Sequence, residues 1–214
     1  FAAAQAQKSL KLKKQYAVSA SVLEETIEGV ALGKIIDRVH PKNVVICEPS
    51  QLKIKLGHKG RIEYLLHIKG KTFHSAFPNK FNNTIHLAAK AITALKDIKF
   101  TNSHEMGDGV LTPTGLETNS NTSMAPSKAI IRFDRRTVPG DSENLANKEI
   151  MEVLNKIDSD AYSLNIEEPE VLTYTGEKIL CKKIFNPWVI DKNHQLVHSL
   201  IQAVEKNKIP IDLG

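Results

Sequence analysis

The sequence has few of the features that define several protein classes. Its 214 residues include two cysteines, Cys47 and Cys181, too few for a disulfide framework and typical of a reducing compartment such as the cytoplasm. No apolar run approaches the ~20 residues that a membrane-spanning helix needs. Internal repeats and low-complexity tracts are absent. These absences exclude a disulfide-stabilised scaffold, a membrane-spanning chain and a repeat protein.

The composition that remains is that of a globular protein. Hydrophobic residues make up 41% and charged residues 25% of the chain, enough for a packed core. The net charge of +5 could indicate a nucleic-acid partner. However, the lysines are scattered, and no aromatic-rich strand or basic recognition helix accompanies them. We therefore expect a solvated, lysine-rich surface and no nucleic-acid partner.

The first part of the chain predicts alternating helices and strands. Short β-branched segments read as buried strands, and the segment between them has apolar residues at helical spacing. Strand, helix and strand of this length form a βαβ unit with two parallel strands. The predicted elements are a helix over 1–14, a strand over 16–23, a helix over 24–39 and a strand over 43–47.

The central part predicts a different architecture. Its elements follow the order β-α-β-β-α-β, the split βαβ arrangement of the ferredoxin-like class. We expect strands over 60–71, 110–118, 128–137 and 161–168, with helices over 83–96 and 143–157. Asp141 or Ser142 could cap the second helix, and a last helix covers 194–206. The predicted fold is thus a partial α/β domain (1–57 and 179–214) interrupted by an α+β ferredoxin-like domain (58–178).

Three glutamates follow the two strands of the predicted βαβ unit. Glu24 and Glu25 stand at the carboxyl end of the first strand and Glu48 at that of the second. Sites in open α/β sheets form outside the carboxyl ends of strands, and converging carboxylates would repel one another unless a cation neutralised them. Alternatively, Glu24 and Glu25 are solvated acids at a helix start, which the helix dipole favours.

Four segments resemble a known enzyme family. VSASVLEETIEG, VVICEPS, GHKGRIEYLLHIKGKTFHSAFP and IIRFDRRTVPG occur in this order. Together they resemble the co-catalytic metallohydrolases that include acetylornithine deacetylase, succinyl-diaminopimelate desuccinylase, aminoacylase and glutamate carboxypeptidase. The tail YTGEKI to FNPWVIDKNHQLV is similar to a subgroup of selenium-metabolism hydrolases. The resemblance implies a zinc-binding catalytic domain interrupted by a lid domain that forms a homodimer.

The same resemblance implies roles for individual residues. Glu24 would be the general base for a metal-bound water, and Glu25 and Glu48 would each bind one of two zinc ions, with cobalt or manganese as alternatives. His74 would donate to the oxyanion in the partner subunit's site, and Arg136 would bind the substrate carboxylate. The implied reaction is hydrolysis of an amide bond in an N-acyl amino acid or small peptide.

Other interpretations stay open at this point. The family's remaining three metal ligands are not in this chain, so we expect it to be the middle of a longer protein. A non-catalytic homodimerisation or binding module, without a complete metal site, is the alternative function. Arg135 could be mistaken for Arg136, and a surface ion pair is the simpler reading of either. Cys47 is expected to be a buried, inert thiol that points away from Glu48.

Overall fold

The computed structural model describes residues 16–78, 80–102, 104–119 and 123–207. The chain divides into two compact units: a central unit, Lys55–Lys192, and a terminal unit formed by Phe1–Ile54 with Asn193–Gly214. The helix predicted over 1–14 lies outside the described residues. In the part of the chain that is described, every helix is too short or too polar to cross a membrane.

The central unit has the predicted order of elements. It runs β2 (Gly60–Lys69), α3 (Thr84–Lys96), β4 (Val110–Thr118), β6 (Lys128–Thr137), α4 (Glu143–Leu154) and β7 (Tyr162–Ile166). This is the β-α-β-β-α-β order of the ferredoxin-like class, so the predicted fold class is confirmed. The predicted boundaries of the inserted domain, residues 58 and 178, fall inside the central unit and stay predictions.

Short strand pairs extend this domain. They are β1 (Gly57–His58) with β11 (Trp188–Val189), β3 (Phe73–His74) with β5 (Met124–Ala125), and β8 (Glu170–Leu172) with β9 (Lys178–Leu180). A further strand, β10 (Ile184–Phe185), pairs with the start of β2. All of these pairs are antiparallel.

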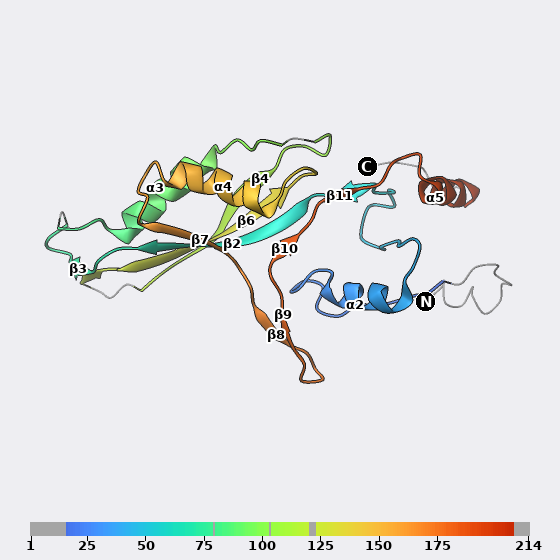
Figure 1. Cartoon of the computed structure of the whole chain (residues 1–214), viewed down its shortest axis with the longest axis horizontal. Coiled ribbons are helices and arrows are strands. Elements are labelled where there is room, and N and C mark those ends of the chain that lie inside the picture. Colours follow the sequence, from blue (N-terminus) through green and yellow to red (C-terminus); the bar gives the residue numbers. More distant parts are fainter. Residues whose placement is uncertain (1–15, 79, 103, 120–122, 208–214) are drawn as a thin grey trace. The chain divides into compact units, whose positions relative to one another are not determined.

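The main sheet is built around β2 and β6. These two strands pair along their whole length, from Gly60 opposite Thr137 to Lys69 opposite Lys128. β4 lies on the far side of β6, and β7 pairs with the outer edge of β2. Both helices, α3 and α4, lie on the same side of this sheet (Figure 1).

The core lies between the sheet and these helices, because residues along each strand alternate between two faces. Along β2, buried residues alternate with half-buried ones from Gly60 to Ile68, and Lys69 at the end of the strand is exposed. Asn83 and Ser142 cap the two helices: their side chains accept hydrogen bonds from the N–H groups of Ile85 (2.9 Å) and Leu145 (3.2 Å). The main core residues are Ile62, Tyr64, Leu66, Ile68, Leu87, Ala88, Ala91, Leu95, Ile131, Phe133, Ala146, Ile150 and Leu154.

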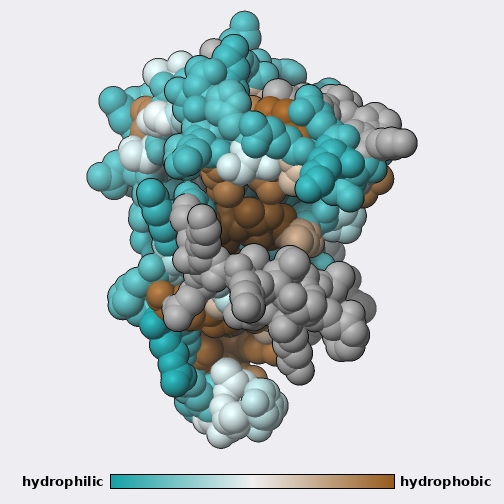
Figure 2. All heavy atoms as spheres, turned by 90° about the vertical axis from the view of Figure 1, so that its right-hand side faces the viewer, coloured by the Kyte–Doolittle hydropathy of each residue, from teal (hydrophilic) through white to brown (hydrophobic). Residues whose placement is uncertain are grey.

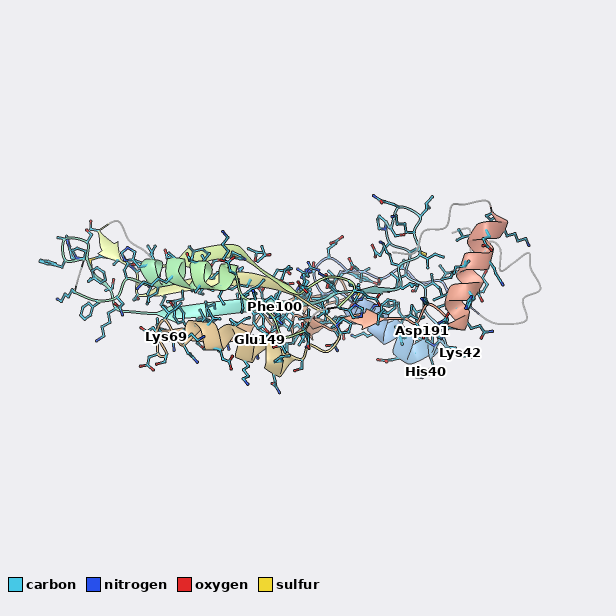
Figure 3. All side chains as sticks on the ribbon, turned by 90° about the horizontal axis from the view of Figure 1, so that it is seen from above. His40, Lys42, Lys69, Phe100, Glu149 and Asp191 are labelled. Atoms are coloured by element: carbon cyan, nitrogen blue, oxygen red, sulfur yellow. The ribbon has the colours of Figure 1, made fainter. Side chains whose placement is uncertain are left out.

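A buried arginine ties the sheet to α4 and to the loop after α3. The Arg135 side chain is fully buried, and its Nη2 donates to Glu149 (2.8 Å) and Asp141 (3.4 Å). Its guanidinium group lies 3.7 Å from the ring centroid of Phe100. Glu149 also accepts the Thr101 N–H at 2.7 Å, and Figure 3 shows Phe100 and Glu149 close together in the central unit. Arg135 is therefore a structural residue.

The terminal unit differs from its prediction. Its described helices are α2 (Val30–Val39) and α5 (Gln195–Lys206), and α2 starts six residues later than predicted, because residues 24–29 form turns. The strands predicted over 16–23 and 43–47 are not formed. A strand needs hydrogen bonds to a neighbour, and within the described residues neither segment has a paired strand.

Several apolar side chains that those strands were expected to bury are exposed. Val18, Val45 and Ile46 are each 54% exposed. In the central unit, Leu172, Tyr174 and Leu180 of the β8–β9 hairpin region are exposed as well. Figure 2 shows further hydrophobic residues, in brown, at the surface of the face that it draws.

The two cysteines lie in opposite environments. Cys47 is exposed, so the expectation of a buried thiol is wrong: the strand that would have buried it is not formed. Cys181 is buried, and loss of solvent raises the pKa of its thiol above the usual value.

The buried arginine predicts a large effect on stability. Arg135→Ala should lower the free energy of unfolding by about 3–5 kcal/mol, because Asp141 and Glu149 would stay buried without their cation. Arg132→Ala is the matched control on the same strand: its side chain is 42% exposed, and surface ion pairs contribute about 0–1 kcal/mol. Urea unfolding monitored by circular dichroism measures both. Equal losses for the two variants would contradict a structural role for Arg135.

The cysteines predict selective alkylation. Since only the thiolate reacts, iodoacetamide at about pH 8 should label Cys47 roughly tenfold faster than Cys181. Peptide mass spectrometry over time measures both sites in one sample, and a Cys47→Ser variant should retain only the slow site. Labelling of Cys181 at the same rate or faster would show that this thiol is not buried in solution.

Candidate functional site

Glu24 and Glu25 lie in a turn that precedes α2. Leu23 has a φ of 58°, and its carbonyl accepts the N–H groups of Thr26 (3.2 Å) and Ile27 (2.9 Å). The Ile27 side chain is 1% exposed, whereas both glutamates are exposed. The turn thus places two adjacent glutamates at the surface.

Glu48 is also exposed and precedes Pro49 in a segment without strand pairing. Among the described residues, no group of three or more His, Cys, Asp or Glu side chains is placed to hold a metal ion. Carboxylate oxygens are suitable ligands for a divalent cation, but Glu25 and Glu48 alone do not complete a metal site. The described part of the chain therefore does not by itself fit the dinuclear centre that the resemblance implies.

His74 lies on β3 in the central unit, with its ring exposed. Its Nδ1 atom accepts the Ala76 N–H at 3.1 Å, and its carbonyl accepts the Phe77 N–H at 2.9 Å. A neutral imidazole that accepts at Nδ1 carries its proton on Nε2. The local backbone therefore favours the tautomer that carries its proton on Nε2, and this N–H is a donor of the kind that can stabilise an oxyanion.

Arg136 and Arg135 point to opposite faces of the sheet, as neighbours on a strand must. Arg135 faces the core, whereas Arg136 lies on the open face with its side chain 43% exposed. Arg136 Nε and Nη2 donate to the two oxygens of Asp134, at 2.8 and 3.1 Å. The structure thus separates the two arginines that the sequence left confusable, and the ion pair expected as the simpler reading is present.

Asp134 was not singled out from the sequence. The signal that could have found it is the two-residue spacing along the predicted strand, which puts Asp134 and Arg136 on one face. Its second cationic partner, Arg61, binds it across the sheet at 3.1 Å. That contact depends on the register of β2 against β6, which the sequence does not reveal.

Arg136 lies near one end of the main sheet, and His74 follows β2 beyond the other end. Arg136 pairs with Arg61 at the start of β2, whereas β3 follows the end of β2 at Lys69. Eight residue steps separate Arg61 from Lys69, or about 26 Å at ~3.3 Å per residue. Figure 1 likewise shows β3 beyond the end of the sheet that is far from β10 and β11.

A surface pocket of about 650 Å³ lies beside the start of α3. Phe81, Asn83, His86 and Lys90 are among the residues that line it. None of the five predicted site residues does so, which means that this pocket does not mark the predicted site.

Comparisons with known proteins cover most of the chain. It is 26% identical over 208 residues to the protein YgeY of Escherichia coli K12, which covers 92% of this chain and 51% of that protein. It is 27% identical over 177 residues to a succinyl-diaminopimelate desuccinylase of Helicobacter hepaticus, covering 78% of this chain and 40% of that enzyme. The chain thus spans about half the length, or less, of these relatives.

Solved structures show the same fold. Aminopeptidase PepT from Bacillus cereus matches 90% of this chain and 48% of its own, with a TM-score of 0.64 at 16% identity. An M20 family metallo-carboxypeptidase from Sulfolobus solfataricus matches 86% of this chain and 61% of its own, with a TM-score of 0.62 at 14% identity.

The family assignment follows from the central unit. Residues 56–161 match the peptidase dimerisation domain of the M20 family. This match covers the first five of the six elements of the ferredoxin-like order, from β2 to α4, and ends directly before β7. With the relatives named above, it confirms the resemblance found in the sequence, and the chain belongs to the M20 family of metallopeptidases and amidohydrolases.

Proposed function

We propose that the full-length protein hydrolyses an amide bond in an N-acyl amino acid or a small peptide. The proposal is supported by the family and by the names of relatives, which include a desuccinylase, an acetylornithine deacetylase and peptidases. All of these names describe enzymes that cleave an amide bond. We also propose the cytoplasm as its compartment, because both cysteines are free thiols.

Three side chains carry the proposed chemistry. Glu24 takes a proton from the attacking water and passes it to the leaving amine. His74 donates its Nε2–H to the oxyanion, and Arg136 binds the substrate carboxylate. Three observations are compatible with these roles: the exposed position of Glu24, the hydrogen bond that His74 accepts at Nδ1, and the partial exposure of Arg136.

The proposed reaction needs a divalent metal, and the described residues supply only part of its ligands. Glu25 and Glu48 would each supply one carboxylate to the zinc ions, and the other ligands would come from outside the described part of the chain. When bound, the metal would polarise the substrate carbonyl and acidify the attacking water.

The single observation that carries the proposal is the separation of His74 from Arg136. Between them lies about 26 Å of β2, from Arg61, which is paired with Arg136, to Lys69, beyond which the chain reaches His74. A small substrate is too short to contact both residues of one chain. The two residues can act on one substrate only if they come from different copies of the chain. A homodimer through the dimerisation domain provides this arrangement, so we propose that His74 completes the partner subunit's site.

A non-catalytic dimerisation module is the second candidate. It is favoured by the family match over residues 56–161, because this match covers the dimerisation domain and leaves out Glu24, Glu25 and Glu48. The two candidates differ in their metal content. A dimer that retains no divalent metal after dialysis of the full-length protein would favour the non-catalytic module.

The proposal makes a direct prediction for Glu24. In the full-length protein, Glu24→Gln should reduce kcat at least about 100-fold, because the amide cannot accept the water's proton. Metal content by elemental analysis should stay unchanged. Asp37→Asn, an exposed acid on α2, is the matched control and should leave kcat unchanged. Wild-type turnover in Glu24→Gln would exclude Glu24 as the base.

A further inference from the structure

The open face of the main sheet has an unusual arrangement of charges around Arg136. In the register of β2 and β6, Arg61 lies directly opposite Arg136, and Glu63 lies directly opposite Asp134. Like charges in directly opposed positions destabilise an antiparallel pair. Both opposed pairs therefore destabilise the pairing of β2 with β6. Ion pairs along and across the two strands offset this repulsion.

Asp134 contacts both arginines of the first opposed pair. One of its oxygens accepts Arg136 Nε, and the other accepts Arg136 Nη2 and lies 3.1 Å from Arg61 Nε. Arg61 in turn pairs with Glu63 at 2.7 Å, and Lys183 lies 3.4 Å from Glu63. Through these contacts, three cations share two carboxylates.

The geometry of Arg136 shows where a carboxylate can bind to this cluster. Asp134 occupies the side edge of the guanidinium group, formed by Nε and Nη2. The end edge, formed by Nη1 and the second N–H of Nη2, has no partner among the described residues in any contact above. An arginine can bind a carboxylate in bidentate fashion along either edge. Asp134 therefore leaves one complete bidentate edge open on a half-exposed side chain.

We propose that Asp134 is a positioning residue that holds Arg136 with its end edge open for the substrate carboxylate, and that Arg61 keeps Asp134 in place. The Asp134 side chain is 18% exposed and contacts Arg61 on the neighbouring strand. It is therefore held more firmly than a solvated acid would be. The role in substrate binding rests on the proposed function, whereas the support of Arg136 rests on the geometry alone.

Asp134→Asn in the full-length protein tests the role in binding. The Asn amide would face an arginine N–H with its own N–H group, so Arg136 should lose its fixed orientation. KM for an N-acetyl amino acid should rise about tenfold with kcat within about twofold, and Arg61→Gln should raise KM by a smaller factor. For the matching substrate with its carboxylate converted to a carboxamide, Asp134→Asn should leave KM unchanged.

Glu117→Gln is the matched control, because Glu117 is a 67% exposed acid on the same sheet that pairs with Arg132. It should leave both substrates unaffected. An equal rise of KM for acid and carboxamide, or no rise for either, would overturn the role of Asp134 in carboxylate binding.

A second measurement separates this inference from the proposed function. In nitrogen-15 spectra of this chain, the Arg136 Nε–H should exchange slowly with water and be lost from the spectrum in Asp134→Asn. This holds even if the full-length protein hydrolyses neither substrate, an outcome that would overturn the proposed function. Equally fast exchange of this N–H in wild type and variant would show that Asp134 does not hold Arg136.

Discussion

The pairing of β2 with β6 is the constraint on which the central unit depends. Ten consecutive residues of each strand lie in register without interruption. Because side chains alternate across a strand, this one register decides which residues enter the core and which reach the open face. A shift by one residue would exchange Arg135 with Arg136, which would expose the buried ion pairs and bury the proposed substrate ligand.

The same pairing sets the distance on which the functional proposal rests. A fully paired strand is a stiff spacer, so the end of β2 that leads to His74 stays about 26 Å from Arg61, the residue opposite Arg136. Dimerisation then becomes part of the proposed chemistry: each lid would bind a carboxylate at one end and supply an oxyanion donor to the other subunit at the opposite end. The open face also explains why a sheet would tolerate two opposed like-charge pairs.

The sequence predicted the central unit better than the terminal unit, for physical reasons. Strand 128–137 and the Ser142 cap depend on alternation and on local hydrogen bonds, which are readable over a few residues. The strands expected over 16–23 and 43–47 depend on partners elsewhere in a sheet, and the described residues provide none. The prediction for Cys47 was wrong for this reason, because it relied on a strand that is not formed.

Some residues of the candidate site could be predicted from the sequence, and others required the structure. The identities of Glu24, Glu25, Glu48, His74 and Arg136 came from strand ends and from the family resemblance, and their roles stay proposals. Distinguishing Arg135 from Arg136 required the register. The two arginines are neighbours on one strand, and the sequence alone does not show which of them faces the core. Arg61 could not be predicted, since it reaches Asp134 only across the sheet.

Subunit complementation tests the central claim, that each site needs residues from two copies of the chain. Full-length His74→Ala and Glu24→Gln would each be purified, mixed in equal amounts, dissociated and reassociated. If His74 acts in the partner's site, half of the dimers are mixed and each contains one intact site, so activity should recover to about a quarter of wild type. If both residues act within one subunit, the mixture should stay as inactive as the two variants, and that result would contradict the account.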